Sequence, residues 1–220
     1  MIIIDTILTI KHRHNIGDDK MSLTHLKMKK LAPNLSYGTS LCSQELFQKI
    51  MRYNPSKDKN PNYPVTNVTL YDSLQFCNKL SCLMGYEPFY LLQNIKYADK
   101  TMTTIVYADV SNNGGKGFRV MREREWEELA CLHREGDRKN HLISLGVFDK
   151  PSLSSIEHDS AFHGINDLYG NAWEWTLSHI PKLNFGCQVY GGSFKSKQGH
   201  YVKRVDYNYS SDDLSFRFAQ

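Results

Sequence analysis

The stretch NDLYGNAWEW, residues 166–175, places a glutamate between two tryptophans directly after a turn. The chain has only three tryptophans in 220 residues, and two of them, Trp173 and Trp175, lie within three positions. Each indole can bury a large apolar area, and the small residues Gly170 and Ala172 let other backbone segments approach closely. Because an unpaired carboxylate among apolar groups is costly, we expect Glu174 to be satisfied, either by backbone N–H groups or by a metal ion.

Length and composition describe an ordinary globular protein. With 40% hydrophobic and 23% charged residues, 220 residues fit one domain with a short extension. The longest apolar runs fall short of the roughly 18–20 residues of a membrane helix. Residues 1–10, MIIIDTILTI, carry Asp5 in their middle and lack the flanks of a signal peptide. We therefore expect no membrane segment and a cytoplasmic location by default, with a viral or phage particle as the alternative.

Charge and cysteine usage narrow the chemistry. The net charge of +4 and the short basic run at 27–30 give no specific signal for nucleic-acid binding. The five cysteines form no CxxC pair, which argues against a zinc site and predicts free, mostly buried thiols. There is no GxGxxG or Walker loop, which argues against a nucleotide-binding fold.

Hydrophobic periodicity predicts an α+β fold. Helical spacing of apolar residues predicts three helices, at residues 43–53, 69–85 and 123–135. Ser43 and Thr69 are the expected N-caps of the first two helices. Strand-like patterns occur at residues 1–12, 88–93, 103–110 and 214–220, whereas residues 13–40 indicate turns and short pieces. The helices do not alternate with strands as they would around a parallel sheet.

Four sequence blocks occur in a recognisable order. They are NPSKDKNPNYPVTNVTLYDSLQFCNKLS (54–81), GFRVMREREWEELA (117–130), DLYGNAWEWT (167–176), and VYGGSFKS with SFRFA (within 189–219). Together they resemble the formylglycine-generating enzyme family, also called the sulfatase-modifying factor domain, which has a C-type-lectin-like fold. The resemblance implies one such domain over residues 41–220, with residues 1–40 as an N-terminal extension packed on it.

The same resemblance implies a structural calcium ion at the tryptophan motif. Its side-chain ligands would be Asp167 and Glu174, and its carbonyl ligands would come from Gly170 and Ala172. Hard oxygen ligands of this kind suit Ca²⁺. The alternative is that backbone N–H groups donate to Glu174 and no metal is present.

The catalytic residues of the family are missing from this chain. The resemblance places the two cysteines of the oxidase site at Lys195 and His200, and Cys187 precedes the GGS motif (191–193). A lysine cannot perform the copper or disulfide chemistry of a thiolate, and the N-terminal segment lacks the HxxxH spacing of an iron site. We therefore expect neither copper nor iron, and a protein that is not an enzyme. The alternatives are a divergent metal-dependent oxidase and an inactive structural or effector module.

A polar run near the C-terminus is the candidate ligand surface. In VDYNYSSDD (205–213), every residue after the valine is Asp, Tyr, Asn or Ser. Each of these types lies at most one adenine change from an asparagine AAY codon, as does histidine. Adenine-directed mutagenesis is the mode of diversity-generating retroelements, so this pattern indicates a variable protein; the alternative is a plain hydrophilic loop.

The surface that we predict binds a protein or a glycan, since tyrosine with small polar residues makes an adaptable binding surface. Arg204 and Arg217 are assigned instead to structural pairing near the core. The predicted ligand-binding residues are Lys195, Lys197, His200, Tyr201, Asp206, Tyr207, Asn208, Tyr209, Ser210, Asp212 and Asp213.

Overall fold

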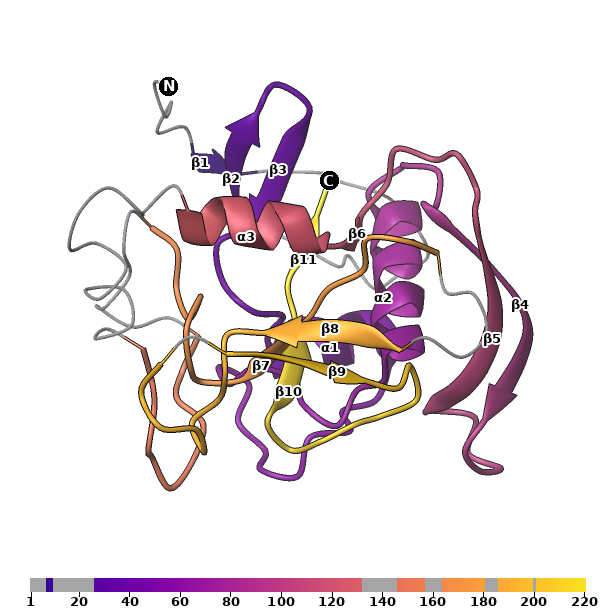
Figure 1. Cartoon of the computed structure of the whole chain (residues 1–220). Helices are drawn as coiled ribbons and strands as arrows, with labels where there is room; N and C mark the ends of the chain where they lie inside the picture. Colours follow the sequence, from indigo (N-terminus) through magenta and orange to yellow (C-terminus); the bar gives the residue numbers. More distant parts are fainter. Residues whose placement is uncertain (1–6, 10–25, 132–145, 157–163, 181–185, 200) are drawn as a thin grey trace.

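Helix α2 stands between a long β-hairpin and two small β-sheets in the computed structural model of the chain (Figure 1). The structure describes residues 7–9, 26–131, 146–156, 164–180, 186–199 and 201–220. Its helices are α1 (Gln44–Met51), α2 (Leu70–Leu83) and α3 (Glu123–Cys131). Its strands are β1 (Ile7–Thr9), β2 (Lys27–Ala32), β3 (Leu35–Gly38), β4 (Tyr90–Tyr97), β5 (Ile105–Asn112), β6 (Arg119–Val120), β7 (Trp173–Trp175), β8 (Cys187–Tyr190), β9 (Val202–Val205), β10 (Leu214–Phe216) and β11 (Phe218–Ala219).

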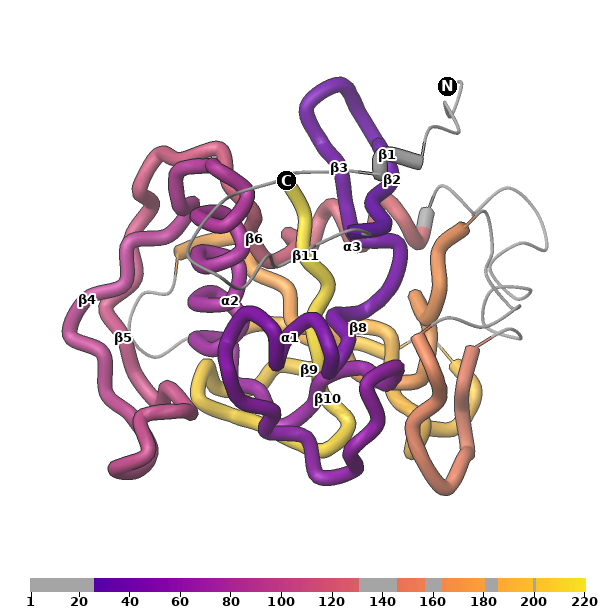
Figure 2. Tube along the Cα trace, turned by 180° about the vertical axis from the view of Figure 1, so that it is seen from behind, coloured from indigo at the N-terminus to yellow at the C-terminus, as the bar shows by residue number. Residues whose placement is uncertain are grey.

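The strands form two small sheets and one hairpin. One sheet has the order β1-β2-β3-β11-β6, the other β10-β7-β8-β9, and β4 pairs with β5. Strand β10 runs parallel to β7, whereas the other pairs are antiparallel. The β4–β5 hairpin lies along one side of the molecule, outside α2 (Figures 1 and 2). This mixture of helices and largely antiparallel strands confirms the predicted α+β class.

The helices begin where the sequence predicts. The Ser43 hydroxyl accepts a hydrogen bond from the Leu46 N–H at 3.1 Å, and Thr69 forms a reciprocal capping box with Asp72. Helix α3 is described as far as Cys131, so the last predicted turn lies outside the described residues. None of the helices in the described ranges has the length and apolar character needed to cross a bilayer.

The aromatic core lies between helices α1 and α2 and the tryptophan motif. The rings of Phe47 and Phe76 stack at 5.6 Å, and Phe216 packs edge-on against Phe76 at 5.2 Å. The Trp175 indole N–H donates to the Val68 carbonyl at 3.1 Å, which satisfies its polar atom inside the core. Of the four cysteines whose side chains are described, three are buried and Cys82 is exposed, and all four are free thiols.

The last predicted strand is in fact two strands in different sheets. Phe216 pairs with Trp175 in one sheet and Phe218 with Val120 in the other, so the chain crosses between sheets at Arg217. All residues from Leu214 to Ala219 are buried, because protein covers both faces of this segment. The alternation that predicted one half-exposed strand therefore does not appear in the exposure of its side chains.

A hairpin replaces the turns predicted in the N-terminal segment. Strands β2 and β3 pair with each other, and β3 adds to the sheet through Tyr37, which pairs with Ala219. The partner strand is about 180 residues away in the sequence, so local turn signals could not reveal this pairing. The predicted strand at residues 1–12 is described only at β1, and its other residues lie outside the described ranges.

A buried ion pair joins the two sheets. The Arg217 guanidinium donates to both carboxylate oxygens of Glu174, at 3.1 and 2.9 Å, and the two side chains are 0% and 1% exposed. The same guanidinium donates to the carbonyls of Gly38 at 3.0 Å and Asn166 at 2.8 Å. Arg217 thereby holds together the tryptophan strand, the end of β3 and the turn that opens the motif.

We expect Arg217→Met to lower the free energy of unfolding by about 3–5 kcal/mol, because it leaves the Glu174 carboxylate buried without its cation. Urea unfolding at neutral pH measures the loss. The control is Glu45→Gln, which breaks the exposed Glu45–Lys49 pair and should cost about 0.5 kcal/mol or less. Equal effects of the two substitutions would show that the buried pair does not support the fold.

Asp72 makes the stability depend on pH. Burial raises the pKa of its carboxyl from 3.8 to about 6, although N–H groups of Ile105 and Thr69 donate to it. The folded protein therefore keeps a proton that the unfolded chain releases, so this contribution to stability is present below about pH 4 and is lost as the pH rises to about 6.

Relative to Asp72→Asn, we expect the free energy of unfolding of the unsubstituted protein to fall by up to about 3 kcal/mol between pH 4 and pH 7, since one pKa unit is about 1.4 kcal/mol. Urea titrations of both proteins at the two pH values measure this difference. A difference that stays constant with pH, or grows in the opposite direction, contradicts the raised pKa.

Candidate ligand-binding surface

The polar segment 206–213 has a backbone fixed by hydrogen bonds. The Leu70 N–H, at the start of α2, donates to the Tyr207 carbonyl at 3.0 Å, and the Asn67 N–H donates to the Ser211 carbonyl at 2.8 Å. Within the segment, the Tyr209 N–H donates to the Asp206 carbonyl at 3.0 Å. These bonds tie the main chain of the segment to a helix end and to a core loop, independently of the side chains that it exposes.

The predicted ligand residues differ in exposure. Tyr201, Tyr207 and Asp212 are half-buried, Asp213 is buried, and His200 lies outside the described residues. The exposed ones are Lys195, Lys197, Asp206, Asn208, Tyr209 and Ser210. Four of the exposed side chains therefore come from one turn, at residues 206–210, and two come from the segment after the GGS motif.

Asp213 departs from the expected surface because it is used inside the protein. Its carboxylate accepts hydrogen bonds from the hydroxyls of Ser193, at 2.8 Å, and Ser211. Its carbonyl accepts from the Trp173 N–H at 2.8 Å, which continues the pairing of β10 with β7. Aspartate fits the composition of the polar run, but the side chain at position 213 supports the fold and is not part of the exposed surface.

An ion pair joins the two parts of the predicted surface. The Lys195 ammonium donates to the Asp212 carboxylate, although the residues are 17 positions apart. The hydrogen bond from Lys195 lowers the pKa of the Asp212 carboxyl. Both side chains are more than one-third exposed, so the pair adds little to stability. The pair brings the segment after the GGS motif against the C-terminal turn, so that the two form one continuous surface.

A cation stacked between aromatic rings lies in the middle of this surface. The Lys203 ammonium sits 4.3 Å from the centre of the Trp173 ring and 5.8 Å from that of Tyr209. Tyr201 contacts the same indole edge-on, at 6.1 Å between ring centres. Sequence reasoning missed Lys203. The signal that could have found it is the alternation along β9 and its extensions, where residues 201, 203, 205 and 207 are half-buried and residues 202, 204 and 206 are exposed.

That alternation also changes the position expected for Arg204. Its side chain is exposed on the outward face of β9 and lines a cleft, whereas the sequence suggested a place near the core. Tyr207 lines the same cleft and packs edge-on against Tyr71, at 6.3 Å between ring centres. The surface therefore has two ends, one at Lys195 and Asp212 and one at Arg204 and Tyr207.

The residues predicted to hold calcium have protein partners. Both oxygens of Glu174 accept from Arg217, and the Asn171 amide donates to Asp167 at 2.9 Å. Gly170 has φ +77°, and a side chain there would lie 2.5 Å from the Val147 carbonyl oxygen, which explains the glycine without a ligand. Ala172 is fully buried. In this arrangement a cation would compete with Arg217 for Glu174, and the calcium site stays a prediction.

Comparisons with known proteins agree with this architecture. Residues 40–219 match the family model described as "Sulfatase-modifying factor enzyme 1-like domain". Over 142 residues the chain is 30% identical to the chaperone protein LppX of Paenibacillus barcinonensis, a match that covers 60% of this chain and 46% of that protein. The matched region thus spans about half the length of this curated relative.

Three solved structures share the fold. Treponema denticola variable protein 1 has a TM-score of 0.67 at 21% identity, covering 97% of this chain and 92% of that one. CarF has a TM-score of 0.62 at 19% identity, with 99% of both chains covered. PvdO from Pseudomonas aeruginosa has a TM-score of 0.52 at 12% identity, covering 84% and 79%. These likenesses confirm the predicted C-type-lectin-like fold of the formylglycine-generating enzyme type.

We expect substitutions along the C-terminal segment to separate into two groups. Asn208→Ala and Ser210→Ala should change the free energy of unfolding by about 0.5 kcal/mol or less, since both side chains are exposed. Asp213→Ala should lower it by about 1–3 kcal/mol, because buried hydroxyls lose their acceptor. Chemical unfolding of the three variants measures this, and similar losses for all three would show that the segment is not a rigid display.

Proposed function

The chain belongs to the sulfatase-modifying factor enzyme 1-like domain family, and from that premise we propose that it binds a ligand on this C-type-lectin-like scaffold without catalysing a reaction. The observation that carries the proposal is the turn at residues 206–210. The Leu70 N–H holds its backbone at the Tyr207 carbonyl, and the Asn67 N–H holds the Ser211 carbonyl directly after it. The exposed side chains of the turn are those of Asp206, Asn208, Tyr209 and Ser210. A rigid backbone with exposed tyrosine and small polar residues loses little entropy on binding, as in antibody paratopes.

The absence of the family's thiol chemistry supports a role in binding. No cysteine follows Cys187 in the sequence, so no thiol stands after the GGS motif. At the first of the two expected cysteine positions, Lys195 pairs with Asp212 on the surface. The rival function, a divergent metal-dependent oxidase, predicts stoichiometric copper or iron in the purified protein. Elemental analysis that found either metal together with oxidase activity would favour the rival.

The ligand that the surface fits best is a protein. Tyr209 and Lys203 present an aromatic and cationic face, and Asp206 and Asn208 supply acceptors and donors beside it. The curated relative is named a chaperone protein, and a protein partner for this chain is consistent with that name. A glycan is the alternative ligand, and binding assays with both classes distinguish them.

Diversification by a retroelement explains the composition of the turn, and it extends the proposal. The fold is shared with a protein named as variable, and the exposed turn residues are the types that adenine mutagenesis of AAY codons produces. Under this proposal the diversified codons must encode residues whose substitution leaves the fold intact. That condition separates the exposed positions 206 and 208–210 from the buried positions 213–219.

We expect the gene to lie near a reverse-transcriptase gene and a second copy of its own 3′ end. The two copies should differ at adenines in codons for exposed residues such as Asp206, Asn208 and Tyr209, and should agree at Asp213 and Arg217. Sequencing of the locus checks this. Differences spread evenly over buried and exposed codons, or a locus with no second copy, would refute diversification.

Binding itself is tested with displayed peptide libraries and glycan arrays. The triple variant Asp206→Ala, Asn208→Ala, Tyr209→Ala should weaken binding of any selected peptide at least tenfold, since such residues supply most of an interface's affinity. The matched control is Gln93→Ala, Lys100→Ala, Ser111→Ala on the exposed β4–β5 hairpin, which should bind as the unsubstituted protein does. Equal affinity of the two triple variants would remove the turn from the site.

A further inference from the structure

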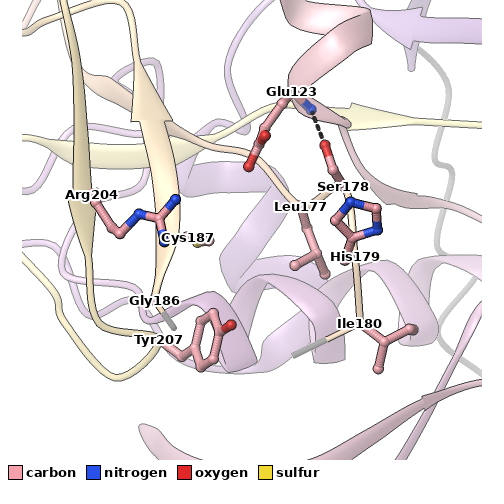
Figure 3. A pocket seen from close by; sticks show the side chains of 9 residues that line it. All are labelled: Glu123, Leu177, Ser178, His179, Ile180, Gly186, Cys187, Arg204 and Tyr207. Atoms are coloured by element: carbon pink, nitrogen blue, oxygen red, sulfur yellow. Dashed lines mark hydrogen bonds between the residues drawn. The ribbon is translucent and has the colours of Figure 1, made fainter. Parts of the chain in front are cut away.

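A cleft at the open end of the β8–β9 pair adjoins the exposed turn at Tyr207, but none of the exposed side chains of residues 206–210 lines it. It has a volume of about 580 Å³ and lies between the start of α3, the segment after β7, and the ends of β8 and β9 (Figure 3). The residues that line it are Glu123, Leu177, Ser178, His179, Ile180, Gly186, Cys187, Arg204 and Tyr207. The β8–β9 turn that follows the GGS motif is at the other end of these strands, so this cleft is not the position of the family's missing cysteines.

Two opposite charges enter the cleft from different elements. Glu123 comes from the first turn of α3 and Arg204 from β9, and Figure 3 shows both side chains directed toward Cys187 between them. Both charges affect the pKa of the Cys187 thiol. Burial raises this pKa most, the Glu123 carboxylate raises it further, and the Arg204 guanidinium lowers it. One anion and one cation therefore act on the same point in the cleft.

The other walls of the cleft combine apolar side chains, a hydrogen-bonded hydroxyl and the exposed His179. Leu177, Ile180 and the ring of Tyr207 give the cleft an apolar side. The Glu123 N–H at the helix start donates to the Ser178 hydroxyl at 3.1 Å, so the helix end does not offer that donor to an anion. The Glu123 carboxylate makes a purely anionic ligand unfavourable, and the Arg204 guanidinium does the same for a purely cationic one.

We propose that this cleft binds a small zwitterionic ligand of the amino-acid type, either free or as the end of a peptide. Its carboxylate faces Arg204, its ammonium group faces Glu123, and its side chain packs against Tyr207 and Ile180. Each charged group then forms a charge-assisted hydrogen bond, which is stronger than a neutral one. The proposal goes beyond the ligand surface on the exposed turn, because it uses none of the exposed side chains of residues 206–210.

Four phenylalanine derivatives test the two charges separately. Phenylalanine carries both, N-acetylphenylalanine only the carboxylate, phenylalaninamide only the ammonium group, and N-acetylphenylalaninamide neither. In isothermal titration or NMR titration of the full chain, phenylalanine should bind most tightly, and loss of either charge should weaken binding about tenfold. Equal affinity for the four compounds, or binding of none at millimolar concentration, would overturn the proposal.

Substitutions then assign each charge to its residue. Arg204→Gln should weaken phenylalanine and N-acetylphenylalanine about tenfold while leaving phenylalaninamide unweakened, and Glu123→Gln should show the reverse selectivity. Controls are Glu128→Gln on the exposed side of α3, where it pairs with Arg124, and Lys100→Gln in the hairpin. If the controls weaken binding as much as the cleft variants do, or if the cleft variants do not discriminate among the compounds, the assignment is wrong.

The same titration separates this proposal from the proposed function. The turn variant Asp206→Ala, Asn208→Ala, Tyr209→Ala should bind phenylalanine as the unsubstituted protein does. Loss of phenylalanine binding in that variant, with binding retained in Arg204→Gln and Glu123→Gln, would place the compound on the exposed turn and overturn the cleft. Peptide binding on the turn can fail independently of either result.

Discussion

The buried pair of Arg217 and Glu174 is the interaction on which the rest of the architecture depends. Moving two charges out of water is expensive, and only a bidentate geometry with further hydrogen bonds compensates for that cost. Arg217 meets this condition, because its guanidinium also donates to the carbonyls of Gly38 and Asn166. It stands where the chain leaves one sheet for the other, so a single side chain sets the relative position of both sheets. The glutamate between the two tryptophans is thus part of the scaffold.

That scaffold separates the backbone from the side chains it presents. Hydrogen bonds from Asn67 and Leu70 hold the C-terminal segment against the start of α2, which is itself fixed by the Thr69 capping box. The outward side chains of this segment contribute little to that support. The surface has an ion-paired end at Lys195 and Asp212, and strand β9 adds an aromatic and cationic middle at Lys203 and a cleft at Arg204. The hydrogen bonds that hold this segment are made by main-chain groups, so they do not depend on its outward side chains.

Local signals in the sequence were sufficient for some elements and insufficient for others. Ser43 and Thr69 mark the helix starts because a hydroxyl before an apolar period caps the first free N–H groups, and this is a short-range effect. The β2–β3 hairpin was missed because its sheet partner, Ala219, lies at the other end of the chain. Asp213 looked like its neighbours in the polar run, yet the hydroxyls of Ser193 and Ser211 surround it. Arg204 was expected near the core but is exposed, because the face on which it lies depends on where β9 begins.

The sequence by itself determined the family, the helix starts and the identity of the segment that varies from the family's pattern. These follow from the order of motifs and from residue types whose preferences act over a few positions. Only the tertiary structure decided which of the polar residues are exposed, which partner satisfies Glu174, and that Glu123 and Arg204 face one cleft. The physical reason is that exposure and charge pairing depend on contacts between segments far apart in the chain, and the packing of the two sheets around Arg217 sets those contacts.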